Sequence, residues 1–166
     1  MQDNALVVID IQNDITKNYK EIVGNINQAI RWAQDSDIPV IYIRHEFLNE
    51  SARTFRPRTP GAELAGDLDI VSDHIFTKNK QNACTCSEFT DFLAEQGIEK
   101  LYLTGADATA CVKSTCYNLA KSGFDVTVLS DCITSYDKKK IPEMLDYYRS
   151  KGARVAGLDE VTTAIG

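Results

Sequence analysis

Short apolar runs alternate with segments of helical spacing along this chain. Runs rich in aliphatic and β-branched residues predict six strands, at residues 5–9, 40–43, 75–78, 101–104, 126–129 and 153–156. Between them, apolar residues three and four positions apart predict helices over 22–33, 111–120 and 142–148. A further helix is expected to be capped by Ser87 and ended by Gly97. The chain therefore alternates strands with helices.

This alternation predicts the architecture. A strand, a helix and a further strand form a right-handed crossover, and successive crossovers build a parallel sheet with helices on both faces. We therefore expect one domain over residues 1–166, a Rossmann-like three-layer αβα sandwich around a six-stranded, mostly parallel sheet. The segment from Phe47 to Asp69 has little periodicity and holds two prolines and two glycines, so it is predicted to be a long ordered loop. Such loops in compact domains are usually functional, for example as a wall of a pocket.

Composition narrows the class of protein. With 43% hydrophobic residues, 25% charged residues and a formal net charge of −6, the chain resembles ordinary globular proteins. Its basic residues are scattered apart from the run 138–140, which is read as a solvated surface, so nucleic acid is not expected as a partner. No apolar run approaches the ~20 residues of a membrane helix, and no secretory signal precedes the first strand, so a cytoplasmic location away from membranes is expected.

Five cysteines, an odd number, are expected to be reduced thiols. Cys84 and Cys86 have one residue between them, whereas the cysteines of zinc knuckles usually have two to four. No Cys-x-x-Cys supports thiol–disulfide exchange. Neither a metal nor another cofactor is therefore predicted, Cys116 and Cys132 are assigned to the core, and a redox role for Cys84 or Cys86 is left open.

Residues whose side chains could take part in catalysis follow several predicted strands. Asp10, Arg44 and Lys78 stand at strand ends, and the loop 105–111 follows another strand and ends in Cys111. Ligands bind at the carboxyl ends of the strands in open parallel sheets. The pattern predicts that a carboxylate, an ammonium and a thiol meet in one crevice.

Five sequence blocks resemble the isochorismatase-like cysteine hydrolase superfamily, which includes nicotinamidases and N-carbamoylsarcosine amidase. The blocks are residues 8–14 (VIDIQND), 43–45 (IRH), 59–64 (TPGAEL), Lys78 with Ala83 five positions later, and 105–112 (GADATACV) continuing into Ser114 and Thr115. The resemblance covers almost the whole chain. It implies the fold predicted above and a catalytic triad of Asp10, Lys78 and Cys111.

The resemblance also implies a mechanism. Cys111 would be the nucleophile, favoured as thiolate by the amino end of a helix and by Lys78, a setting expected to lower the cysteine pKa. Asp10 would take the thiol proton and return it to the leaving amine. A cis peptide bond between Ala106 and Asp107 would turn the backbone amides of Asp107 and Cys111 toward one oxyanion.

The chain departs from its relatives at the pocket. The resemblance assigns nicotinamidases an extra metal site of an Asp and several His after the second strand, whereas this chain has only His45 and His74. Ile15 replaces a usual aromatic residue and Cys84 a usual phenylalanine. Arg44 and His45 could orient a carboxylate or carbonyl of the substrate, or belong to an internal salt bridge. The expected pocket residues are Gln12, Ile15, Arg44, His45 and Cys84.

The sequence therefore predicts a cysteine hydrolase that cleaves a small amide, ureide or carbamoyl substrate through a thioester. The alternative is an isochorismatase-type protein or a catalytically silent relative that serves as a small-ligand binder or subunit. The expected partners are a small-molecule substrate and further copies of the chain, in a dimer or larger homo-oligomer with Phe55, Tyr147 and Tyr148 as candidate contact residues. The sequence does not identify the substrate.

Overall fold

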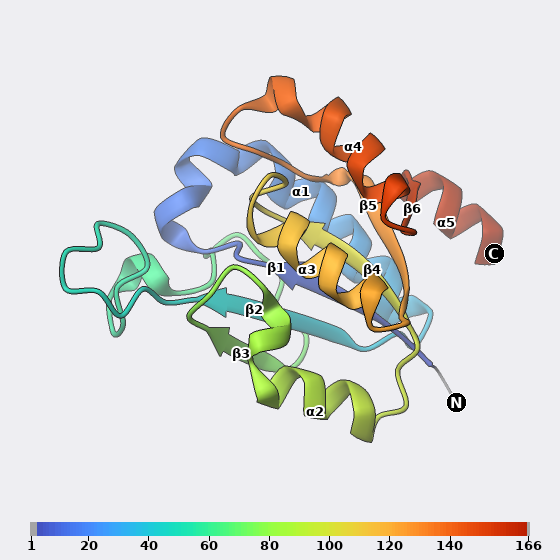
Figure 1. Ribbon diagram of the computed structural model, residues 1–166, viewed down its shortest axis with the longest axis horizontal. Coiled ribbons are helices and arrows are strands. Elements are labelled where there is room, and N and C mark those ends of the chain that lie inside the picture. Colours follow the sequence, from blue (N-terminus) through green and yellow to red (C-terminus); the bar gives the residue numbers. More distant parts are fainter. Residues whose placement is uncertain (1–2, 166) are drawn as a thin grey trace.

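A six-stranded, wholly parallel sheet forms the centre of the molecule (Figure 1). The computed structural model describes residues 3–165, apart from the side chains of 16–18 and 164–165. The strands are β1 (Asn4–Ile9), β2 (Val40–His45), β3 (Ile75–Lys78), β4 (Lys100–Gly105), β5 (Asp125–Ile133) and β6 (Arg154–Ala156), in the spatial order β3-β2-β1-β4-β5-β6. All six predicted strands are confirmed, although β5 continues four residues beyond its predicted end.

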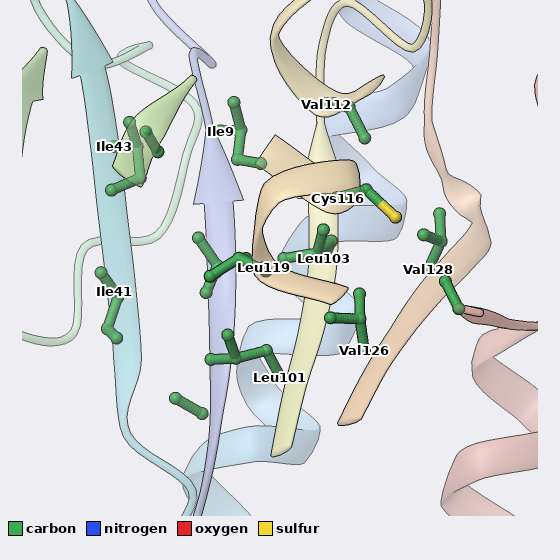
Figure 2. Close-up of a cluster of buried hydrophobic side chains, with 14 of the residues drawn as sticks. Ile9, Ile41, Ile43, Leu101, Leu103, Val112, Cys116, Leu119, Val126 and Val128 are labelled. Carbon is green, nitrogen blue, oxygen red and sulfur yellow. The ribbon is translucent and has the colours of Figure 1, made fainter. Parts of the chain in front are cut away.

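Helices cover both faces of the sheet, as predicted. They are α1 (Asn13–Asp35), α2 (Ser87–Glu95), α3 (Cys111–Lys121), α4 (Ile141–Ser150) and α5 (Leu158–Ile165). Apolar residues of α1 and α5 share one core cluster with one face of the sheet, and residues of α2, α3 and α4 share the other. Figure 2 shows Val112, Cys116 and Leu119 of α3 over side chains of β1, β4 and β5. The three-layer αβα sandwich is confirmed.

The central strand β1 shows why this sequence forms such a sheet. Residues Ala5–Ile9 are wholly buried because successive side chains point to opposite faces and both faces are covered. Residues on one side of β1 pack with α3, and those on the other side pack with α1. Since β1 lies between β2 and β4, the residue that follows it emerges at the middle of the sheet edge.

Three local features differ from the prediction. Helix α1 begins at Asn13, nine residues before its regular apolar spacing, and it is kinked at Tyr19, where the backbone leaves helical geometry. Helix α5 was not predicted. Ser87 begins α2, but the cap position is Cys86 and no side chain caps this helix, so the predicted Ser87 cap is wrong.

The long loop after β2 is ordered by contacts with the start of α1. It contains one turn of 3₁₀ helix, η1 (Pro60–Ala62), and Leu64 forms an isolated bridge with Gln12. Phe55 in this loop is only 6% exposed, and its backbone N–H donates to the Asp14 carboxylate at 2.7 Å.

Within the described part of the chain, no helix is both long and apolar enough to cross a membrane.

Candidate active site

Three parallel strands end beside one another and deliver three polar side chains to the same edge of the sheet. Asp10 directly follows β1 and has a left-handed backbone, with φ of 57°, while its N–H donates to Ile43 of β2 at 2.9 Å. His45 and Lys78 are the last residues of β2 and β3 and are paired in register. Paired residues on neighbouring strands project to the same face, so the imidazole and the ammonium lie together.

The Lys78 ammonium is the centre of the site. Its Nζ lies 3.1 Å from Asp10 Oδ2, 2.7 Å from His45 Nδ1 and 3.4 Å from Cys111 Sγ. The Lys78 side chain has no exposed surface and that of Asp10 has 3%. An ammonium has three N–H donors, and these three contacts provide one acceptor for each. The predicted meeting of carboxylate, ammonium and thiol is present, with an imidazole as a fourth member.

Burial shifts the titration of the groups around Lys78. It raises the pKa of Asp10, although the positive charge of Lys78 and hydrogen bonds from Cys111 and Lys78 act in the opposite direction. For His45, burial and the neighbouring ammonium both disfavour the imidazolium and lower the pKa to about 4. At neutral pH the imidazole is therefore uncharged.

The predicted pKa shift of Cys111, the first residue of α3, is wrong in direction. The helix terminus and Lys78 were expected to lower its pKa, but burial, reinforced by the negative charge of Asp10, raises it to about 12. Lys78 opposes this shift without reversing it. The resting site therefore contains a thiol beside the Asp10 carboxylate, rather than a preformed thiolate.

Gln12 holds the strand ends in place. Its fully buried side-chain amide donates to the carbonyl of His45 at 2.9 Å and to that of Ala62 at 2.7 Å, and its carbonyl oxygen accepts from the His45 N–H at 2.8 Å. These bonds join the start of α1, the end of β2 and η1. The structure therefore places Gln12 as a bridge that orients His45.

Arg44 lies apart from the Lys78 cluster. Neighbouring residues in a strand point to opposite faces, and Arg44 bonds to Thr77 Oγ1 at 3.1 Å, to the carbonyl of Ala62 at 2.9 Å and to Glu46 at 3.5 Å. Of the two roles left open for Arg44, the internal salt bridge is the one observed. This face of β2 has its own cavity, of about 400 Å³, lined by Arg44, Glu63, Leu64, Ile70 and Ile75.

The two remaining predicted pocket residues lie on different sides of the sheet. Ile15 is half-buried and packs against the core beneath α1. Cys84 is half-buried in η2 (Ala83–Thr85) and packs against the core beneath α3, where burial raises its pKa to about 11. The elevated pKa makes Cys84 a weak nucleophile at neutral pH.

The loop from Gly105 to Cys111 brings the thiol to the end of β1. The peptide bond between Ala106 and Asp107 is cis, as the family resemblance implies. Gly105 has a φ of 121°, and a Cβ at this position would lie 2.1 Å from the carbonyl oxygen of Ile9, so only glycine allows β4 to end this close to β1. Among the described residues, no hydrogen-bond acceptor is assigned to the backbone N–H of Asp107 or of Cys111.

The Asp107 side chain, which sequence reasoning did not single out, ties this loop to its surroundings. Its carboxylate accepts from the N–H and hydroxyl of Thr109, both at 2.9 Å, from the Tyr136 N–H at 3.0 Å and from the Tyr19 hydroxyl at 3.2 Å. Burial alone would raise the pKa of Asp107, but hydrogen bonds from Tyr136, Thr109 and Ser135 outweigh it, so the pKa is lowered. No spacing along the sequence links residues 19, 107 and 136, so only the fold reveals this contact.

Thr115 is a second supporting residue whose contact the sequence did not reveal. Its hydroxyl accepts from the backbone N–H of Ala83 at 3.0 Å, which fixes the segment after Lys78 to α3. Both residues belong to the blocks that carried the family resemblance. The sequence therefore marked both positions but did not indicate that they contact each other.

One set of side chains in the described part of the chain could offer three ligand atoms to a metal ion. The atoms come from Asp10, His45 and Cys111 and lie within 4.8 Å of one another. The Lys78 ammonium already contacts all three side chains, so a divalent ion would have to displace it. His74 is not part of this set. Its ring lies against Phe92, with 4.6 Å between centroids.

Comparisons with known proteins identify the family of this chain. Residues 4–160 match the isochorismatase domain family, and the chain belongs to this family. It is 27% identical over 156 residues to a protein of Arabidopsis thaliana named as a probable inactive nicotinamidase, covering 78% of this chain and 80% of that one. It is also 26% identical over 140 residues to an uncharacterized isochorismatase family protein of Bacillus subtilis, covering 79% and 78% of the two chains.

Solved structures share the fold at lower identity. An isochorismatase family protein from Desulfovibrio vulgaris superimposes with a TM-score of 0.91 at 19% identity, over 99% of both chains. The pyrazinamidase of Pyrococcus horikoshii in complex with zinc gives 0.84 at 22% identity, over 95% of this chain and 100% of that one. N-carbamoylsarcosine amidase from Thermoplasma acidophilum gives 0.82 at 20% identity, over 94% and 96%.

Proposed function

We propose that this protein is a cysteine hydrolase that cleaves a small amide, ureide or carbamoyl compound. The observation that carries the proposal is the buried contact of Lys78 Nζ with both Asp10 and Cys111, at 3.1 and 3.4 Å, at the carboxyl edge of the sheet. A family that includes proteins named pyrazinamidase and N-carbamoylsarcosine amidase supports C–N bond cleavage.

In the first half of the reaction, Asp10 takes the proton from Cys111 Sγ while the sulfur attacks the substrate carbonyl. The raised pKa of Asp10 makes it a stronger base for this transfer than an exposed aspartate. The carbonyl oxygen becomes an oxyanion, for which the backbone N–H groups of Asp107 and Cys111 are the proposed donors. When the C–N bond breaks, the leaving amine receives the proton from Asp10 and a thioester remains on Cys111.

In the second half, water attacks the thioester and gives a proton to Asp10. The C–S bond then breaks, the acid product leaves, and the sulfur recovers the proton. Lys78 stabilises the negative charge that passes between Asp10 and Cys111, because an opposite charge within ~4–6 Å favours the ionised form. Every step uses side chains that already touch in the resting site.

A panel of small amides, ureides and carbamoyl compounds, assayed by ammonia or amine release, tests the proposal. Wild-type protein should turn over at least one class, and Cys111→Ala should abolish this turnover. Cys132→Ala is the matched control, since it removes a buried thiol from the core on the other face of the sheet and should retain activity. Intact-mass detection of an acyl adduct on wild type, absent from Cys111→Ala, would support the thioester.

A negative panel has a defined meaning. If no substrate turns over but a small carbonyl compound binds and shifts the melting temperature, the alternative of a catalytically silent ligand binder is favoured. Turnover that persists in Cys111→Ala would contradict cysteine catalysis.

A further inference from the structure

His45 is a buried histidine for which the reaction proposed above has no role. Its side chain is almost fully enclosed, with the residue 2% exposed. Its Nδ1 lies 2.7 Å from Lys78 Nζ, the shortest of the three contacts of this ammonium. Since the ammonium can only donate, the imidazole must accept through Nδ1, and the tautomer is fixed with its proton on Nε2.

The surroundings hold this imidazole in one orientation. The Gln12 amide brackets the His45 backbone through both its N–H and its carbonyl. The rings of Phe47 and Phe55 lie at centroid distances of 4.3 and 6.1 Å from the imidazole. His45 is thereby prevented from leaving Lys78, and it is neutral at the pH of most cells because its pKa is lowered to about 4.

The other two partners of Lys78 change during the proposed reaction. Asp10 becomes a neutral acid when it takes the thiol proton, and Cys111 becomes an acylated, uncharged sulfur in the thioester. A buried ammonium left without strong acceptors is unfavourable. Among the three contacts, His45 is the acceptor that neither gains nor loses a proton in this sequence of steps.

We propose that His45 is a positioning residue that holds the Lys78 ammonium between Asp10 and Cys111 throughout turnover. This inference rests on the proposed function and assigns the residue an effect through Lys78, with no contact to the substrate. A purely structural role would predict that His45 matters only through packing. The two roles predict different effects when His45 is replaced by a side chain of similar size that has no hydrogen-bond acceptor.

Two substitutions separate the readings. His45→Asn keeps an acceptor oxygen close to the position of Nδ1, whereas His45→Leu fills similar space without an acceptor. Phe47→Leu is the matched control, because it removes an aromatic neighbour of the imidazole and leaves the contact with Lys78 intact. Circular dichroism and thermal melting first establish that each variant is folded.

The primary readout is the alkylation rate of Cys111 by iodoacetamide between pH 7 and pH 10, followed by peptide mass spectrometry. This readout needs no substrate. With Lys78 no longer held against the sulfur, the thiolate loses its stabilising charge, so His45→Leu should label at least tenfold more slowly than wild type at each pH. His45→Asn should recover most of this rate and Phe47→Leu should match wild type. Equal labelling of His45→Leu and wild type would overturn the proposal.

A second measurement keeps the wild-type His45 side chain, so it does not depend on the folding of any His45 variant. The chain has two histidines, so ¹⁵N-histidine labelling gives two imidazoles, and His74→Gln assigns them. The Nδ1 of His45 should show the shift of an unprotonated acceptor from pH 6 to pH 8. A protonated Nδ1 would overturn the proposal.

Turnover separates this inference from the proposed function. On any substrate that the amide panel identifies, His45→Leu should lower kcat at least tenfold with little change in KM, and His45→Asn should restore it. If Cys111→Ala is inactive while His45→Leu keeps the wild-type kcat, the hydrolase proposal stands and the role of His45 fails.

Discussion

Single residues in this site differ in what their removal leaves behind. Lys78 neutralises a buried carboxylate, and the side chains of the pair are 0% and 3% exposed. Removing one partner of such a pair leaves an uncompensated buried charge, which typically destabilises a protein by 3–5 kcal/mol. The raised pKa of Asp10 offers a partial escape, because the lone carboxyl can become neutral by taking up a proton.

Lys78→Met should therefore destabilise the protein in a pH-dependent way. At pH 8 we expect the free energy of unfolding to fall by about 3 kcal/mol, because Asp10 must be buried as an anion without its counter-ion. At pH 5 the loss should be smaller, since protonation of Asp10 in the variant removes the charge. Urea denaturation at both pH values measures the difference.

Lys20→Met provides the control, since Lys20 is an exposed residue of α1 and its loss should change stability by less than about 0.5 kcal/mol. An equal destabilisation of Lys78→Met at both pH values would contradict the assigned ion pair.

At the scale of elements, the site depends on how closely β1 and β4 approach. Ile9 and Gly105 are paired in register at the ends of these strands, and the Ala106 N–H donates to the Ile9 carbonyl at 3.0 Å. Asp10 and the loop that carries Cys111 leave the sheet directly after this pair. A small displacement here would separate the thiol from the carboxylate.

Gly105→Ala should damage this junction. Its Cβ would fall 2.1 Å from a backbone oxygen, which no side-chain movement can relieve, and the φ of 121° is unfavourable for alanine. We expect a loss of at least about 3 kcal/mol in the free energy of unfolding, or failure to fold.

Gly24→Ala is the matched substitution, because a Cβ at this exposed position of α1 meets nothing within 4 Å. It should increase the free energy of unfolding by about 0.5–1 kcal/mol, as thermal or urea denaturation would measure. Similar effects of the two substitutions would contradict the steric argument.

The whole molecule shows which features a sequence can predict. Strands apolar on both faces and helices of regular spacing were recognised because burial leaves a periodic signal. Asp10, Lys78 and Cys111 were brought together correctly because the carboxyl ends of parallel strands share one edge. The roles of Gln12 and Arg44 could not be assigned, since the sequence does not state which loop carbonyl each side chain will meet.

Predictions of surface residues were less accurate than predictions of core residues, because surface positions leave no periodic pattern in the sequence. Phe55 and Tyr148 were expected to face a partner chain, but they are 6% and 0% exposed, so this assignment is wrong. Tyr148 instead donates its hydroxyl to the carbonyl of Ala108, below α3. An aromatic residue in a loop or on a helix carries no periodic mark that distinguishes a core position from a contact surface. The homo-oligomer itself stays a prediction.

The pH dependence of the free energy of unfolding tests the environment of His45. Between pH 4 and pH 6.5 this buried histidine should make its own contribution to that dependence. The pKa of His45 is about 4 in the folded protein, against about 6.5 in an unfolded chain. Between these values the unfolded chain binds more protons, so the free energy of unfolding falls as the pH decreases from 6.5 to 4. The stabilisation from the neutral imidazole is complete above pH 6.5.

His45→Asn should remove this contribution to the pH profile, because an amide does not titrate. His74, Asp10 and the other acidic groups remain in both proteins, so the difference between the two profiles isolates His45. Urea denaturation at half-unit steps from pH 4 to pH 8 should show wild type losing on the order of 2–3 kcal/mol more than the variant as the pH falls. Parallel profiles across this range would mean that His45 titrates as it does in water, which is incompatible with an imidazole enclosed beside the Lys78 ammonium.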